Sequence, residues 1–111
     1  LWARDPARAD EIAAARANPR YLPGVALPPK VAVTADADAG LRGARLALLA
    51  VPVQHLRATL AGLPATDAAL LLCAKGVERG TTRFPLEIVQ ELRPAARAAV
   101  LSGPNFAGEV A

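Results

Sequence analysis

The stretch A-L-L-L-C-A-K-G-V-E, Ala69–Glu78, decides the fold that we expect for this chain. An apolar run of strand length ends abruptly at Lys75-Gly76. Strands that are apolar on consecutive residues are typical of parallel sheets covered on both faces. Ligands of such sheets bind at the carboxyl ends of the strands. The stretch therefore predicts a buried parallel strand that carries one cation and a flexible glycine to a potential site.

The segments around this stretch repeat the same pattern. Two more apolar runs, Leu46–Val51 and Ala98–Leu101, lie before and after it. Between the runs, apolar residues recur at helical spacing. They are Val53, Leu56, Leu60 and Leu63 in the first interval and Phe84, Ile88 and Leu92 in the second. Strands that alternate with helices predict an α/β fold with a parallel sheet, right-handed crossovers and helices on both faces.

The first third of the chain carries weaker signals. Asp5-Pro6 has the N-cap residue and the early proline of a helix, which we expect over Ala7–Ala17 with Ile12 as its one large apolar anchor. The other expected segments are the tail of a strand at Leu1–Arg4, an extended loop or turn at Pro19–Pro29, a short strand at Val31–Thr34 and one or two helical turns at Ala35–Gly43.

Composition limits the class of protein. The 111 residues are 53% hydrophobic with a net charge of +3, which suits one globular domain with a modest core. The charges are scattered singly, and this argues against a nucleic-acid surface. The single cysteine, Cys73, allows no disulfide within the chain, so a reducing cytoplasmic setting is the default. We find no signal peptide, and every apolar run is too short for a membrane span.

Two strand ends carry the residues that could perform chemistry. Lys75 could stabilise a developing alkoxide on a reacting carbonyl, or give it a proton, although a lysine at a strand end can also simply reach solvent. After the last strand, Ser102-Gly103-Pro104 leads into an expected helix whose first amides, from Asn105 onward, are free to bind a phosphate or carboxylate. The alternative for this second motif is a plain strand-to-helix turn.

Arg4-Asp5 stands where a dinucleotide-binding fold meets the adenine ribose. At that strand end an acid favours NAD, whereas an arginine accommodates the 2′-phosphate of NADP. If Asp5 caps the following helix, Arg4 is the better cofactor candidate.

The remaining polar residues suggest structural roles. We expect His55 at the surface and Cys73 in the core, with Asp36 and Asp38 capping a turn. The sequence shows no metal-ligand spacing, so we expect no metal site.

Five motifs together resemble the bacterial type of NAD(P)-dependent glycerol-3-phosphate dehydrogenase. They are L-W-A-R-D at Leu1–Asp5, N-P-R-Y-L-P-G at Asn18–Gly24, A-V-P-V-Q at Ala50–Gln54, K-G-V-E at Lys75–Glu78 and S-G-P-N-F-A-G-E-V-A at Ser102–Ala111. The resemblance implies an oxidoreductase that interconverts dihydroxyacetone phosphate and sn-glycerol 3-phosphate with NAD or NADP, and so supplies glycerophospholipid synthesis.

The resemblance also implies roles for individual residues. Lys75 would be catalytic and would contact both cofactor and substrate. The other implied cofactor positions are Arg4, Tyr21 and Ala107. The other implied substrate positions are Gly103 and Asn105, where Asn105 replaces the serine or threonine often found in the family.

The same resemblance implies that residues 1–111 are part of an NAD(P)-binding domain. The expected fold is a Rossmann-like, doubly wound parallel sheet that is incomplete, because the family's first strand and glycine-rich loop are missing from this sequence. The helical C-terminal substrate domain is also missing. We therefore expect the isolated chain to be poorly stable and inactive, and the full-length protein could be a homodimer.

Two other functions remain open from the residues alone. A related Rossmann-fold dehydrogenase could act on another hydroxy or keto substrate, since fold does not determine substrate. A non-enzymatic basic module that binds nucleic acid would need clustered arginines, and here they are dispersed.

Overall fold

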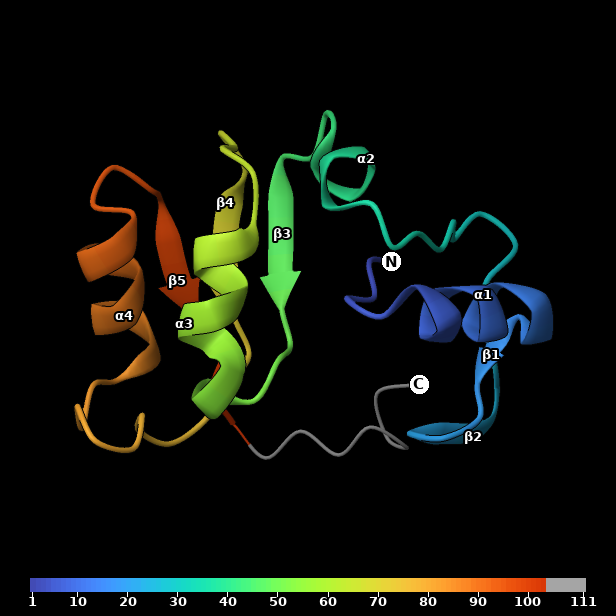
Figure 1. Ribbon diagram of the computed structural model, residues 1–111, viewed down its shortest axis with the longest axis horizontal. Coiled ribbons are helices and arrows are strands. Elements are labelled where there is room, and N and C mark those ends of the chain that lie inside the picture. Colours follow the sequence, from blue (N-terminus) through green and yellow to red (C-terminus); the bar gives the residue numbers. More distant parts are fainter. Residues whose placement is uncertain (104–111) are drawn as a thin grey trace. The chain divides into compact units, whose positions relative to one another are not determined.

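The computed structural model describes residues 1–103, which form two compact units, Leu1–Arg42 and Gly43–Gly103. Figure 1 shows both units with their elements labelled. Within the described residues, none of the helices has the length and apolar character needed to cross a membrane.

The second unit contains a three-stranded parallel sheet with a helix in each crossover. Its elements are β3 (Leu46–Leu49), α3 (Val53–Gly62), β4 (Ala69–Leu72), α4 (Pro85–Leu92) and β5 (Ala98–Val100). The strand order is β3-β4-β5, with Leu49 beside Leu72 and Leu72 beside Val100. The predicted α/β alternation and the predicted parallel sheet are therefore confirmed, and the sheet is consistent with a partial Rossmann-like fold.

The core of this unit lies between the sheet and its two helices, which cover the same face in Figure 1. Six side chains are at most 2% exposed: Leu56 and Leu60 on α3, Leu70 and Leu72 on β4, and Ile88 and Val89 on α4. Burying one such side chain contributes about 1.5–3 kcal/mol, so these contacts hold the helices on the sheet.

The opposite face of the sheet differs from the prediction that helices cover both faces. Leu46 and Leu48 on β3 are 50% and 61% exposed, whereas Leu49, on the helix-covered side, is buried. Within Gly43–Gly103 no helix covers the side of Leu46 and Leu48, so burial alternates along β3 although the sequence is apolar throughout.

The apolar stripe predicted for α4 is wrong at both ends. Phe84 is 61% exposed and Leu92 is 37% exposed, while Pro85, Ile88 and Val89 are buried. Phe84 is the N-cap, with an extended backbone, and its amide donates to Oε2 of Glu87 at 2.8 Å. The helix therefore begins one residue later than the stripe assumed, and its buried face is rotated accordingly.

The first unit begins with α1 (Pro6–Ala15), as predicted. Asp5 is its N-cap and accepts a hydrogen bond from the Ala7 amide at 3.0 Å, while Ile12 is buried with 5% exposure. The helix ends two residues before the predicted Ala17, because Arg16 takes the left-handed conformation with φ of 50°.

Part of the segment predicted as a loop or turn at Pro19–Pro29 is a strand. β1 (Ala17–Asn18) pairs antiparallel with β2 (Leu22–Ala26). Pro23 within β2 is exposed, as expected for a proline at the edge of a two-stranded sheet. Proline density alone therefore overestimated the irregular structure here.

One isolated parallel bridge joins Trp2 and Thr34. It stands where we predicted two strands, at Leu1–Arg4 and Val31–Thr34. The Thr34 carbonyl accepts from the Ala3 amide at 3.0 Å, and the Thr34 amide donates to the Leu1 carbonyl at 2.9 Å. After this bridge comes α2 (Ala37–Leu41), which confirms the predicted helical turn. Its N-cap is Asp36, whose carboxylate accepts from the amides of residues 38 and 39 at 2.9 and 3.2 Å.

Candidate functional site

Lys75 stands just beyond the carboxyl end of β4, as predicted. The Cys73 amide donates to the Leu49 carbonyl at 3.0 Å, which continues the pairing with β3 past the last strand residue. Lys75 itself is exposed, and Gly76 then turns the chain with φ of +86°. Because a side chain is strained at such a φ, glycine at this point suits the sharp exit from the sheet.

The structure places the Lys75 ammonium against the end of the neighbouring strand. Its Nζ donates a hydrogen bond to the carbonyl oxygen of Gly103. Pairing with β4 extends beyond β5 through the Leu101 amide, which donates to the Leu72 carbonyl at 2.9 Å. Two predicted site residues, Lys75 and Gly103, therefore meet at the carboxyl ends of the strands, where parallel strands end side by side.

The structure describes two of the other predicted site residues, Arg4 and Tyr21. Arg4 and Tyr21 belong to the first unit and both are exposed. The Tyr21 ring lies near two guanidinium groups, with Cζ of Arg8 at 5.8 Å and Cζ of Arg20 at 5.3 Å from its centroid. Such cation–π contacts orient an exposed aromatic ring. The predicted positions Asn105 and Ala107 lie outside the described residues.

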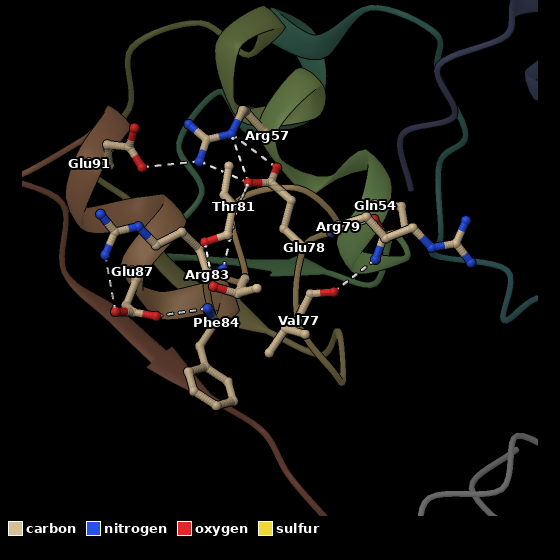
Figure 2. A network of polar contacts seen from close by, with 11 residues as sticks. Gln54, Arg57, Val77, Glu78, Arg79, Thr81, Arg83, Phe84, Glu87 and Glu91 are labelled. Atoms are coloured by element: carbon tan, nitrogen blue, oxygen red, sulfur yellow. Dashed lines mark hydrogen bonds and ion pairs between the residues drawn. The ribbon is translucent and has the colours of Figure 1, made fainter.

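A group of polar side chains binds the loop that follows Lys75 (Figure 2). Gln54 on α3 contacts the backbone on both sides of Glu78. Its Nε2 donates to the Val77 carbonyl at 2.8 Å, and its Oε1 accepts from the Arg79 amide at 2.9 Å. One amide side chain therefore holds two consecutive peptide groups of the loop.

Arg57, one turn further along α3, holds the same loop through the side chain of Glu78. Its Nε lies 3.0 and 3.1 Å from the two carboxylate oxygens, and its Nη2 lies 3.0 Å from Oε2. Glu78 also accepts from the Thr81 hydroxyl at 2.5 Å, and Arg57 reaches Oε2 of Glu91 on α4 at 3.0 Å. We call Gln54, Arg57 and Glu78 the loop clamp.

Charge pairing shifts the pKa values of these groups in the directions expected of a strong ion pair. The hydrogen bonds from Arg57, and then from Thr81, lower the pKa of Glu78. The same guanidinium lowers the pKa of Glu91, and Glu78 in turn raises the pKa of Arg57. Glu78 is only 8% exposed, and burial alone would raise its pKa, but the hydrogen bonds from Arg57 and Thr81 outweigh that effect and keep the carboxylate ionised near neutral pH.

Sequence reasoning singled out Lys75 but missed the loop clamp. The spacing of Gln54 and Arg57 does place them on one face of α3. Nothing local to α3 indicates that this face meets the loop after β4, because Arg57 and Glu78 are 21 positions apart.

The described residues offer few other candidate sites. Two open hollows lie at the amino ends of the strands, lined in part by Arg45, Asp67 and Arg97, and Lys75 lines neither of them. Residues 1–103 contain no cluster of His, Cys, Asp and Glu side chains that could hold a metal ion. His55 is exposed, as predicted.

The family model, the similar sequences and a similar solved structure all indicate the same family. A family model described as NAD-dependent glycerol-3-phosphate dehydrogenase N-terminus matches residues 1–111. A relative from Aromatoleum aromaticum named glycerol-3-phosphate dehydrogenase (NAD(P)+) is 49% identical over 114 residues. A relative of the same name from Methylibium petroleiphilum is 50% identical over 115 residues. Each alignment covers 100% of this chain.

A solved structure of similar fold is the glycerol-3-phosphate dehydrogenase from Coxiella burnetii. It matches 99% of this chain with a TM-score of 0.86 and 29% sequence identity, and the match spans 34% of that protein. The chain likewise spans about a third of the curated relatives, 35% of the first and 34% of the second.

Proposed function

The chain belongs to the family of NAD-dependent glycerol-3-phosphate dehydrogenase N-termini, and we propose that it forms part of an enzyme that interconverts dihydroxyacetone phosphate and sn-glycerol 3-phosphate with NADH or NADPH. The observation that carries this proposal is the match of all 111 residues to relatives that bear this name at about half identity. The product would supply glycerophospholipid synthesis.

Lys75 is the residue that we assign to catalysis. A nicotinamide cofactor, when bound, would supply the hydride that reduces the substrate carbonyl. Negative charge then develops on the carbonyl oxygen, and an ammonium within hydrogen-bond reach stabilises that charge or supplies the proton. Lys75 suits this role because its ammonium is exposed at the carboxyl ends of the strands and, among residues 1–103, its hydrogen-bond partner is the Gly103 carbonyl. It can exchange that neutral acceptor for a substrate oxygen.

The remaining site residues extend this proposal. Gly103, beside Lys75, and Asn105 would bind the substrate, and Lys75 would contact substrate and cofactor alike. Ala107 and Tyr21 would contact the cofactor. Arg4, exposed just before the N-cap of α1, would meet the adenine ribose, where its charge suits the 2′-phosphate of NADP.

Further parts of the protein follow from the same proposal. Residues 1–111 would be part of the NAD(P)-binding domain, with a separate helical substrate domain in the remaining two thirds of the length. The partner would be a small phosphorylated substrate, since dispersed charges offer no nucleic-acid surface. A cytoplasmic enzyme suits the single half-buried cysteine, Cys73, and a homodimer is the assembly that we propose.

The test uses a completed protein, in which residues 1–111 replace the matching segment of the Methylibium petroleiphilum relative. We expect it to oxidise NADH or NADPH when dihydroxyacetone phosphate is added. Lys75→Ala should lower kcat by about 100- to 1,000-fold, because one preorganised stabiliser of the developing charge is removed. Lys30→Ala, which changes the only other lysine and an exposed one, should leave kcat unchanged.

Two results would contradict the proposal at different points. A completed protein that melts cooperatively yet oxidises neither cofactor would overturn the assigned reaction. Near-normal turnover in Lys75→Ala would leave the reaction standing and overturn the role of the lysine.

A further inference from the structure

The position of Lys75 is restrained by the sheet on one side only. Before it, backbone hydrogen bonds tie the chain to β3, ending with the Cys73 amide on the Leu49 carbonyl. After it comes Gly76, whose φ of +86° lies in a region that only glycine adopts readily. A glycine next to Lys75 permits many chain directions, so something beyond the sheet must select the observed one.

The loop clamp supplies that selection immediately after the glycine. Gln54 binds the Val77 carbonyl and the Arg79 amide, so the peptide groups that flank Glu78 are held against α3. These contacts begin two residues beyond Lys75. They leave little freedom for the lysine backbone between the last sheet hydrogen bond and the first clamp contact.

The Glu78 side chain anchors the same segment more firmly. A bidentate guanidinium–carboxylate pair is directional as well as strong, and this carboxylate is largely buried. Arg57 also bonds Glu91, which ties the loop to α4 as well as α3. The loop closes on itself through the Glu78 amide, which donates to the Arg83 carbonyl at 2.9 Å.

The loop contains backbone that would not hold this shape unaided. Thr82 has φ of 57°, which is rare for a β-branched residue, and Gly80 has φ of 84°. Strained conformations persist where the surrounding contacts determine them, and they gather at functional sites. The Thr82 amide donates to the Glu78 carbonyl at 2.9 Å, so the residue with the unusual φ is bonded directly to a residue of the clamp.

We propose that Gln54, Arg57 and Glu78 are positioning residues, which determine where the Lys75 ammonium lies at the carboxyl ends of the strands. The inference rests on the function proposed above, because it assigns these residues to the reaction through Lys75. None of the three needs to touch substrate or cofactor. Their effect on rate arises because small misplacements of a catalytic group are costly, of the order of 100-fold for 1 Å.

The first test is Glu78→Gln in the completed protein. The amide keeps the size of the side chain but cannot accept both guanidinium bonds. We expect kcat to fall by about 10-fold, and this fall should exceed any change in the Kd for NADH, since Lys75 stabilises charge mainly in the transition state. Glu87→Gln is the matched control, because the same change affects only an exposed pair with Arg83 and the amide can still cap α4.

A double-mutant cycle separates positioning from general stabilisation. If Glu78 acts through Lys75, then Glu78→Gln should change the residual kcat of the Lys75→Ala protein by less than about 2-fold. An equal loss in both backgrounds would overturn the inference. So would a Glu78→Gln protein that melts at a lower temperature but turns over at the original rate.

Hydrogen exchange gives a readout that needs no activity. In Glu78→Gln, and in Gln54→Leu as a second variant, the peptide that spans residues 75–83 should exchange faster, while peptides from β3 and β4 keep their protection. Unchanged exchange in 75–83 would overturn the inference even if the completed protein were inactive. A failure of the proposed reaction is therefore distinguishable from a failure of the clamp.

Discussion

Two charged side chains only three positions apart in the K-G-V-E motif have opposite surroundings. Within the described part of the chain, Lys75 is exposed and bonded to a neutral carbonyl, whereas Glu78 is 8% exposed and bonded to Arg57 and Thr81. Under the proposed function, Lys75 would exchange its present partner for a substrate oxygen, and a neutral carbonyl is a weaker competitor than a carboxylate. A carboxylate that holds a loop is stabilised when both of its oxygens accept hydrogen bonds, because an unpaired buried charge is costly. Under the proposals above, one short motif would combine a catalytic lysine with the carboxylate that positions it.

The lowered pKa values of Glu78 and Glu91 predict acid sensitivity with a definite sign. A carboxyl whose pKa is depressed by folding stabilises the protein above its unfolded pKa, which is about 4.3 for glutamate, and loses that contribution as pH falls through the folded value. We expect the Tm of the completed protein to change little through these groups from about pH 7 to pH 5 and to fall below that range.

The acid profiles of variants test whether this loss of stability at low pH comes from the clamp. Tm measured against pH should fall less steeply in Glu78→Gln than in the unchanged protein, because the variant has no carboxylate left to protonate there. Arg42→Ala, which changes no carboxyl group, should keep the original slope. Identical acid profiles for all three proteins would show that the ion pair contributes nothing measurable to stability.

At the scale of elements, one arginine joins the ends of the two helices that cover the sheet. Arg93 is the C-cap of α4, and its amide donates to the Val89 carbonyl at 2.7 Å. Its guanidinium crosses to the end of α3, where it donates to the carbonyls of Leu60 at 2.7 Å, Pro64 at 3.0 Å and Leu63. A cation at a helix C-terminus satisfies free carbonyls and interacts favourably with the helix dipole.

Arg93→Ala should therefore weaken the packing of α4 beside α3. Three carbonyls lose a charged donor in a half-buried place, and we expect a loss of about 2 kcal/mol in the free energy of unfolding. Urea denaturation of the completed protein measures it. Arg93→Lys should lose less stability than Arg93→Ala. The control Arg42→Ala, at an exposed arginine after α2, should change the free energy of unfolding little. A loss in Arg93→Ala no larger than in Arg42→Ala would exclude the capping role.

At the scale of the whole molecule, the second unit taken by itself has a sheet with one face and one strand edge that its own helices and strands leave uncovered. Leu46 and Leu48 are largely exposed on the face away from α3 and α4. Among the described strands, β3 pairs with β4 alone, so its outer edge carries unpaired backbone groups. Exposed leucines beside an open strand edge are features that folded proteins normally cover.

We therefore expect residues 1–111 alone to be poorly stable and inactive. Heating followed by circular dichroism should give a broad, weakly cooperative transition, and the isolated chain should not oxidise NADH. Leu48→Lys should reduce its aggregation, because a charge replaces an apolar side chain that is 61% exposed. A sharp cooperative melt together with NADH oxidation by the isolated chain would contradict this expectation.

The sequence by itself determined the features that depend on near neighbours. The caps at Asp5 and Asp36, the apolar spacing of α3 and the runs that became β3, β4 and β5 all act within a few residues. The parallel sheet followed from them. The contact of Lys75 with Gly103 followed as well, because the carboxyl ends of neighbouring parallel strands lie on the same side of the sheet.

Only the tertiary structure decided which surfaces meet. The β1–β2 hairpin, the exposure of Phe84 and the uncovered side of β3 each depend on what packs against them, which propensity and spacing do not contain. The same holds for the clamp. Arg57 meets Glu78 across 21 positions because α3 packs beside the loop after β4, and the spacing of residues along α3 does not contain that contact.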